Sequence, residues 1–264
     1  AGLRTFDVMN VSVWTLGWRN LWRDVRSGDM RLLIVAVALA VAALTAVGFF
    51  ADRLQTGLTR DARQLIGGDA VVVADNPLPP EFAQRARDAG LAISQTLTFP
   101  TMARASDAQG GESRLVTLKA VDAAYPLRGQ LSLSAQADGS AAHPQRGAPA
   151  RGEAWVDAPL LDALGLQVGD ELLLGDASFR VRRLIVKEPD RGGGFLSFSP
   201  RVMVADADMA ATGLIQPASR VNYRLAVAAA GAKPGAKDGL NAGMNAAAGE
   251  AAVKRFADWA QQQA

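Results

Sequence analysis

The sequence predicts an α+β protein that is anchored in a membrane by a single helix near its N-terminus. One observation is an uncharged run, Leu32–Phe50, whose 19 residues are enough to cross a bilayer. Another is the rest of the chain, where short strands rich in Val and Leu alternate with apolar-striped helices and Gly- or Pro-rich turns. The predicted architecture is a transmembrane helix with a stalk, followed by a split βαβ domain that carries an inserted small antiparallel β module.

The composition excludes several classes of protein. The chain has 264 residues, of which 49% are hydrophobic, so it is neither disordered nor short of material for a core. It has no Cys and one His, which excludes disulfides, thiolate metal sites and a cysteine nucleophile. The net charge of +2 comes from residues 1–31, which hold five Arg and three Asp. The folded part is therefore not expected to bind nucleic acid, because that would require a basic surface.

A buried core helix or a cleaved signal peptide could also produce an apolar run. A core helix of this length normally keeps a polar face, and a signal peptide has a shorter apolar stretch that ends in a small-x-small cleavage site. Here 31 residues precede the run, and Ala51-Asp52-Arg53 follows it. We therefore expect an uncleaved transmembrane helix. The preceding Arg residues predict a cytoplasmic N-terminus, with the main domain on the periplasmic side of the inner (plasma) membrane.

Residues 1–31 contain an amphipathic stretch with three tryptophans on one helical face. Two explanations remain open for it. The stretch is either a helix lying against lipid in the membrane interface or an ordinary helix packed against other protein. Under the first explanation, the residues at the membrane interface are Trp14, Trp18, Trp22, Arg19, Arg23, Arg26 and Arg31.

The apolar helix is predicted to continue beyond the membrane as a stalk that reaches about residue 68. Leu54, Leu58, Ala62 and Leu65 form a stripe at helical spacing, and two glycines at 67–68 supply a stop. The helix as a whole is expected over residues 31–66. Its stripe requires a partner, which is either the chain's own domain or another helix.

The outer domain is predicted to comprise residues 69–134 and 218–264, with the inserted β module over 152–217. The first segment has the pattern of strand, helix, strand and strand, whereas the last has a strand, a low-complexity linker over Ala229–Gly249 and a helix. The second unit thus lacks a closing strand, and we expect an open sheet edge that promotes self-association. The elements are expected at 70–74, 80–89, 91–105, 114–121, 154–156, 159–164, 220–228 and from about 253 to the end.

Catalytic motifs are not found in the sequence. There is no Gly-x-Ser-x-Gly elbow, no phosphate-binding loop and no carboxylate cluster with metal-ligand spacing, so we expect no enzyme activity and no bound cofactor or metal. Lys119 lies in a strand and is expected to have a structural role, paired with Asp122. Four aspartates near strand ends or turns are expected to accept hydrogen bonds from backbone amides, namely Asp69, Asp75, Asp122 and Asp157.

The loop over residues 188–198 combines charged residues, three glycines and two phenylalanines. An exposed loop with aromatic side chains is a candidate docking site for a partner. The alternative is a hairpin whose phenylalanines are tucked into the β module. The candidate docking residues are Glu188, Asp190, Arg191, Phe195 and Phe198.

Several longer strings of residues are specific enough to compare with known families. They are KAVD-x-x-YPLRG from Lys119, WVDAPLLDALGLQVG from Trp155, and EPD…F…SPRVM…TGLIQP-x-SR from Glu188. Together with the apolar helix and the residues before it, they resemble the YbbP-type permeases of ABC transporters, within the FtsX/MacB/LolE superfamily. The resemblance covers most of residues 12–228. It implies a permease subunit with a porter-like α+β outer domain and an inserted β part.

The resemblance also implies partners and an activity. Such permeases pair with a separate cytoplasmic ATPase, which binds the ATP, and are expected to work as a dimer. The YbbP-like branch is linked with hydrophobic or lipid-like compounds and with a periplasmic thioesterase/lysophospholipase. Relatives have further transmembrane helices, so two functions remain open. The chain is a permease subunit or its N-terminal fragment, or it is a free-standing, membrane-anchored periplasmic binding or adaptor domain.

Overall fold

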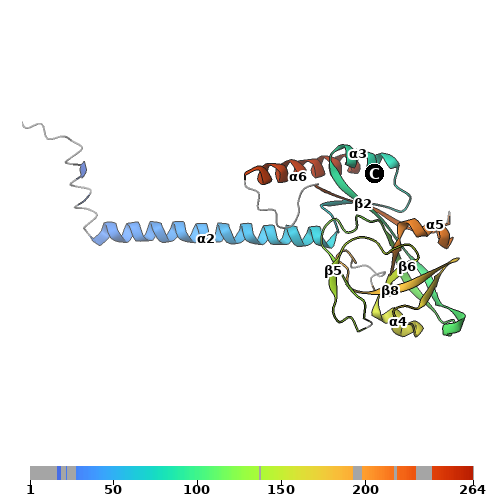
Figure 1. Ribbon diagram of the computed structural model, residues 1–264. Helices are drawn as coiled ribbons and strands as arrows, with labels where there is room; N and C mark the ends of the chain where they lie inside the picture. Colours follow the sequence, from blue (N-terminus) through green and yellow to red (C-terminus); the bar gives the residue numbers. More distant parts are fainter. Residues whose placement is uncertain are drawn as a thin grey trace, which may run out of the picture. The chain divides into compact units, whose positions relative to one another are not determined.

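The computed structural model describes residues 17–18, 22, 28–136, 138–192, 198–216, 219–229 and 240–263 (Figure 1). The chain divides into two compact units, Ala1–Thr59 and Arg60–Ala264. The first holds most of one long helix, and the second is a domain of strands and short helices. The predicted α+β class with an N-terminal apolar helix is confirmed.

Helix α2 runs over Gly28–Leu65 as one continuous element, so the predicted helix over 31–66 is confirmed. Among the described residues it is the one helix that is long and apolar enough to cross a membrane, with a mean hydropathy of 2.7 in its most apolar window. At ~1.5 Å per residue, its 38 residues extend about 57 Å, almost twice the ~30 Å hydrocarbon core. Leu54, Leu58 and Leu65 of the stalk stripe are all exposed, and the partner of this stripe stays a prediction.

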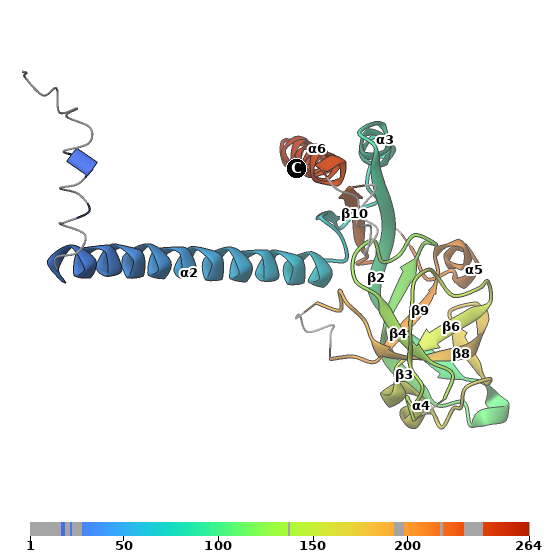
Figure 2. The same cartoon turned by 60° about the vertical axis from the view of Figure 1, so that its left-hand side comes forward.

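The second unit contains a three-stranded layer in the order β1-β10-β2, formed by Ala70–Ala74, Asn222–Ala229 and Leu91–Ala105. Neighbouring strands in the layer are antiparallel. Helices α3 (Pro80–Asp88) and α6 (Leu240–Gln261) pack on one face of it and lie beside each other in Figure 2. Burial of their apolar faces against the sheet holds this layer together. The buried residues are Phe82, Ala86, Leu91, Leu225, Val227, Ala252, Val253, Phe256 and Ala260.

The second half of β2 leaves this layer and enters a closed barrel. The ring of neighbours runs β2-β3-β9-β6-β8-β7 and returns to β2. The added strands are β3 (Ser113–Val121), β9 (Arg201–Ala205), β6 (Glu153–Val156), β8 (Ala177–Lys187) and β7 (Glu171–Leu174). Strands β4 (Leu131–Ser134) and β5 (His143–Gln145) extend the sheet from β8, and the short helices are α4 (Ala158–Leu164) and α5 (Met209–Thr212).

Two expectations about this domain are wrong in detail. The β module expected over 152–217 is mixed rather than antiparallel, because β6 pairs with β8 in parallel, and its strand β9 also pairs in parallel with β3 outside the module. Periodicity along one strand does not reveal its neighbours. The linker expected over Ala229–Gly249 is helical from Leu240, because its many alanines favour helix. Gly249 permits close packing there, since an added Cβ would lie 2.6 Å from the Ala229 Cβ.

Candidate functional site: the turn between the stalk and the outer domain

Helix α2 ends in a tight turn, Ile66–Asp69, which we call the exit turn. Gly67 has a positive φ of 69°, which favours glycine. The backbone of the turn is bonded to the outer domain at three points. The Ile66 carbonyl accepts from Arg224 Nη2 at 3.3 Å, the Gly67 carbonyl accepts from the Arg128 amide at 3.1 Å, and the Asp69 amide donates to the Val227 carbonyl at 2.8 Å. The end of the helix is therefore fixed to β10 and to the loop after β3.

Asp69 adds a two-point ion pair to this attachment. Its carboxylate accepts from Arg128 Nε at 2.8 Å and Nη2 at 2.6 Å, and also from the Ala229 amide at 2.9 Å. Burial would raise the pKa of Asp69, but the bonds from Arg128 and Ala229 outweigh it and hold the pKa below its ordinary value. The predicted bonds from backbone amides are found for Asp69, and also for Asp122 and Asp157.

Next to the exit turn lies a buried group of charged and polar side chains, which we call the ion cluster. Its centre is Lys119 on β3, which is only 2% exposed. The Lys119 ammonium donates to Glu188 Oε1 at 2.7 Å, Asp190 Oδ1 at 2.8 Å and the Tyr125 hydroxyl at 2.8 Å. All three of its protons are thus used, as a buried ammonium requires. The other members are Arg201 and Arg224.

Tyr125 and Asp190 are hydrogen-bonded within the ion cluster, and burial and neighbouring charges shift the pKa of each. The Tyr125 hydroxyl donates to Asp190 Oδ1 while accepting from Lys119. Burial raises the pKa of Tyr125 well above its ordinary value, and the charges of Asp190 and Glu188 raise it further. Burial would also raise the pKa of Asp190, but Lys119, the Tyr125 hydroxyl and Arg224 outweigh it and leave that pKa lowered. The cluster is therefore built around a neutral phenol and an ionised carboxylate.

The two arginines connect the ion cluster to its surroundings. Arg201, at the start of β9, donates from Nε to Glu188 Oε2 at 3.0 Å. Arg224, on β10, donates from Nη1 to Asp190 Oδ2 at 3.2 Å, while its Nη2 reaches the Ile66 carbonyl. One arginine thus joins the buried carboxylate to the end of the stalk helix.

Close backbone packing completes the site. An added Cβ at Gly129, whose φ is 79°, would lie 2.9 Å from the Pro189 Cβ. An added Cβ at Gly67 would lie 3.2 Å from Asp190 Oδ2. Both glycines allow the segment after β8 to approach the exit turn and the loop after β3, so a larger side chain would force the three segments apart.

A second branch of charges lies beside the ion cluster. Asp157 Oδ2 accepts from Arg191 Nη2 at 2.6 Å and from the Arg201 amide at 3.1 Å, and Arg201 Nη2 donates to the Arg191 carbonyl at 3.3 Å. Within the described part of the chain, Asp157 Oδ1 and Arg201 Nη1 are buried without a hydrogen-bond partner. These charges hold the base of the 188–198 loop against β9.

The candidate docking loop differs from its prediction. Glu188 and Asp190 are buried in the ion cluster rather than exposed, because each carboxylate is paired with a buried cation. Arg191 is held by Asp157. Phe198 is 86% exposed, and Phe195 lies outside the described residues. Docking of a partner through the exposed end of the loop stays a prediction.

Two other sequence predictions concern charged and aromatic side chains. Lys119 does not pair with Asp122, which instead accepts from Ser94 Oγ at 2.8 Å. Trp18 and Trp22 are helical and exposed, and the Arg31 side chain is exposed on α2. The remaining membrane-interface residues lie outside the described residues, namely Trp14, Arg19, Arg23 and Arg26. Their contact with lipid stays a prediction.

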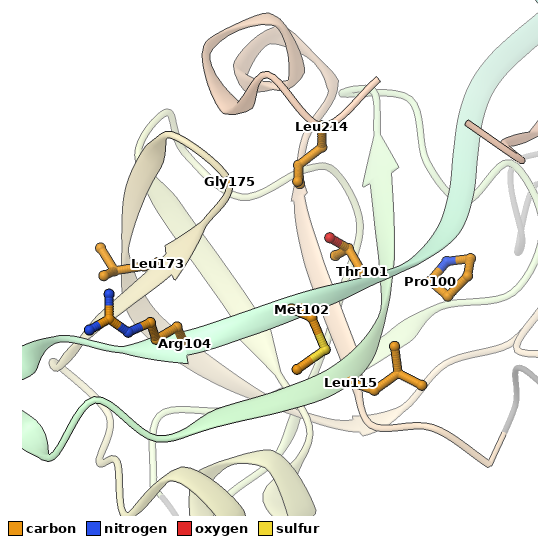
Figure 3. A pocket seen from close by; sticks show the side chains of 8 residues that line it. All are labelled: Pro100, Thr101, Met102, Arg104, Leu115, Leu173, Gly175 and Leu214. Carbon is orange, nitrogen blue, oxygen red and sulfur yellow. The ribbon is translucent and has the colours of Figure 1, made fainter. Parts of the chain in front are cut away.

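A second surface feature is an apolar groove on the barrel, of about 590 Å³ (Figure 3). Met102 and Leu115 lie opposite each other on β2 and β3 and are both half exposed. The guanidinium of Arg104 on the same wall is paired with Asp107. Among the described residues no group of three or more acidic or His side chains could hold a metal ion. The groove thus offers shape and apolar surface rather than reactive groups.

Comparison with known proteins relates this chain to a class of transporters. No family model matches the chain. The chain is 33% identical over 206 residues to YbbP, an uncharacterized ABC transporter permease of Escherichia coli strain K12. It is a relative of the YbbP-type ABC transporter permeases. The matched region is 78% of this chain and 24% of the E. coli protein, so this chain spans about a quarter of that length.

Two solved structures have lower similarity to the YbbP relative. One is the periplasmic region of MacB from Actinobacillus actinomycetemcomitans, with 10% identity and a TM-score of 0.35, covering 74% of this chain and 87% of that one. The other is a domain assigned to a permease of Porphyromonas gingivalis, with 12% identity and a TM-score of 0.32, covering 55% of this chain and 62% of that one.

The strings that carry the family resemblance converge on the ion cluster and the exit turn. KAVD-x-x-YPLRG contributes Lys119, Tyr125 and Arg128, and EPD contributes Glu188 and Asp190. The motifs can be recognised in the sequence, but the sequence does not show that their side chains meet in one buried cluster. The signal for this cluster in the sequence is Lys119, which lies among apolar residues of a strand. A buried ammonium requires carboxylates nearby, so such a lysine predicts buried acidic partners.

Proposed function

We propose that the chain is part of a membrane permease of the ABC transporter class, and that the exit turn passes movement of the membrane helix to the outer domain. The 33% identity to YbbP over 206 residues supports the permease role. The observation that carries the mechanical role is the attachment of the exit turn, whose two carbonyls and one carboxylate are all bonded by the outer domain.

The physical basis is stiffness. An α-helix is a stiff element, whereas a free loop at its end would absorb a displacement by changing its own dihedral angles. Here the helix end is bonded to β10 and to the loop after β3, and Arg224 continues the connection into the buried ion cluster. A tilt or shift of α2 would therefore move these strands together with it.

The partners and cargo are proposed from the same relationship. A separate cytoplasmic ATPase would bind ATP and drive the motion, and two permease units would act as a dimer. The cargo would be hydrophobic or lipid-like compounds that are exported or extracted from the inner membrane, with a periplasmic thioesterase or lysophospholipase as a further partner. The N-terminus would be cytoplasmic and the outer domain periplasmic.

Purification in detergent tests the permease role. The tagged protein, in the length in which its cell makes it, is expected to co-purify with an ABC ATPase. Recovery of periplasmic proteins alone would instead indicate the free-standing adaptor. Membrane topology is tested by single cysteines at Ser12 and Ser106, since these 264 residues contain no Cys of their own. They are expected to label from opposite sides, and labelling of both from outside would contradict the proposed orientation.

Mechanical coupling is tested in the same complex. A fluorescent label on Phe198→Cys, an exposed position, is expected to report ATP-dependent movement of the outer domain. Arg128→Ala removes the two-point ion pair with Asp69 but keeps the bonds to the backbone of the turn, so it should weaken that signal while the ATPase still binds. The control is Arg182→Ala, because Arg182 is exposed and pairs with Glu153 far from the exit turn in sequence. A signal of unchanged size in Arg128→Ala would refute transmission through this ion pair.

A further inference from the structure

A pocket of about 740 Å³ lies beside the end of the stalk helix. Part of its lining comes from the last turns of α2, and the rest comes from β4, β5, the end of β8 and the segments next to the exit turn. All of these residues belong to the second compact unit. The volume lies within the ~300–1,000 Å³ of small-molecule sites, so the pocket is large enough for a ligand with a polar head and part of an alkyl chain.

The strand side of the pocket carries two cations. Lys187 on β8 lies directly opposite Ser132 on β4, and Ser132 lies directly opposite Pro144 on β5. Residues paired in this way point to the same face of the sheet, and Arg146 follows β5 and lines the same pocket. With strands ~4.8 Å apart, the two long side chains can converge on one anion above Ser132. Both cations are exposed, and no carboxylate among the described residues is paired with either.

The helix side of the pocket carries one anion. Asp61 on α2 is exposed and has no ion-pair partner among the described residues, whereas Arg63 in the same turn pairs with Glu250. Leu65 follows Asp61 by four residues, so the two side chains share one face of the helix, and Leu65 is 67% exposed. The helix therefore presents a carboxylate and an apolar side chain to the pocket.

The charges of the pocket select the class of ligand. A simple anion would be attracted by Arg146 and Lys187 but repelled by Asp61, and a simple cation would meet the opposite forces. A zwitterion satisfies both sides, with its anionic group at the two cations and its cationic group at Asp61. The Ser132 hydroxyl offers the anionic group a further donor.

Apolar side chains next to these charges provide a surface for the rest of the ligand, since Leu65, Pro144 and Pro189 all line the pocket. We propose that the pocket binds a zwitterionic amphiphile, namely a lipid whose headgroup is phosphoethanolamine. The phosphate would accept hydrogen bonds from the two cations, the ammonium would pair with Asp61, and the first carbons of the chain would contact the apolar side chains. The proposal rests on the proposed function for the role of this lipid as cargo, whereas the binding site is argued from the pocket alone.

Calorimetry tests the proposal on the protein in the length in which its cell makes it, held in amphipol without added lipid. The probe is a short-chain lysophosphatidylethanolamine, kept below its micelle concentration. It is expected to bind about tenfold more tightly than lysophosphatidylglycerol of the same chain length, because the second headgroup has no ammonium for Asp61. Glycerophosphoethanolamine, which has the headgroup but no chain, should bind about tenfold more weakly than the probe, since it buries no alkyl surface.

Three variants locate the site. Lys187→Gln and Arg146→Gln should each weaken the binding of both lysolipids about tenfold, the effect of one lost hydrogen bond to a charged group. Asp61→Asn should weaken only the phosphoethanolamine lipid and so abolish the preference between the two headgroups. The matched controls are Arg182→Gln on β8 and Asp162→Asn on α4, which lie outside the pocket lining. All five positions are exposed, so each variant is expected to fold, and an unchanged thermal unfolding temperature checks this.

Three results would overturn the proposal. One is the same affinity for both lysolipids in the unchanged protein. Another is binding that neither Lys187→Gln nor Arg146→Gln weakens, which would place the ligand elsewhere on the protein. The third is equal binding of glycerophosphoethanolamine and the lysolipid, which would assign the pocket to a soluble ligand. In each case the ABC ATPase can still co-purify, so failure of this site is distinguishable from failure of the permease role.

Discussion

The two halves of the outer domain are stabilised in different ways. The three-stranded layer is held by apolar contacts such as Phe82 and Phe256 with Trp259, whose ring centroids are 4.8 and 5.9 Å apart. The region beside the exit turn is held by buried charges around Lys119. Apolar packing loses stability in proportion to the area removed, whereas a buried charge cluster loses it steeply when one member is missing. The difference suggests that the first region provides a platform and the second a rigid connection.

The largest effect is expected from removing the central cation of the ion cluster, Lys119. Lys119→Met removes the cation that Glu188 and Asp190 share and leaves each carboxylate with one arginine, and we expect a loss of ~3–5 kcal/mol in the free energy of unfolding. Adding Asp190→Asn should restore part of that loss, because one of the two weakened carboxylate sites loses its charge while its remaining partner, Arg224, is partly exposed to solvent. Urea unfolding in detergent measures both variants. A loss below ~1 kcal/mol for Lys119→Met would show that water reaches the cluster.

The apolar layer is tested by Phe256→Ala on α6. This side chain is buried against the sheet, and its truncation is expected to cost about 3 kcal/mol through lost burial and a cavity. Lys254→Ala, an exposed change on the same helix, should lie within about 0.5 kcal/mol of the parent protein. An equal effect of the two changes would mean that α6 does not pack as described.

Acid should affect the region of buried charges before the apolar layer. The pKa values of Asp69 and Asp190 are lowered in the folded state, so their contribution to stability is present above the unfolded-state value and is lost as pH falls through the folded values. We therefore expect stability to decline below about pH 4. Asp69→Asn should make the decline shallower. Thermal unfolding at pH 3–7 measures it, and parallel pH curves for both proteins would contradict the assignment.

The smallest effect is expected for an exposed ion pair. Arg182 and Glu153 approach to 3.6 Å, but Arg182 is exposed and Glu153 is only partly buried, so Arg182→Gln should change stability by less than about 0.5 kcal/mol. Raising the salt concentration should erase even this difference. A loss comparable to that of Lys119→Met would remove the distinction between buried and exposed charges in this domain.

The sequence alone determined the local elements of this protein. The uncharged run predicts α2, and the two glycines after it predict where the helix stops, because both signals lie within one segment. Strands β1 and β2 were predicted with the bounds that the structure shows, since their flanking turns carry Gly, Pro and Asn.

The tertiary structure alone decided where distant charges meet. Lys119 and Asp190, which form an ion pair, are 71 residues apart in the sequence. Arg201, which pairs with Glu188, is brought next to them by the parallel pairing of β3 with β9, and this pairing leaves no pattern in the sequence of either strand. Sequence reasoning placed Glu188 and Asp190 on an exposed loop because isolated carboxylates are normally solvated. The buried ammonium and guanidinium groups reverse that preference, and their positions follow from strand order rather than from sequence neighbours.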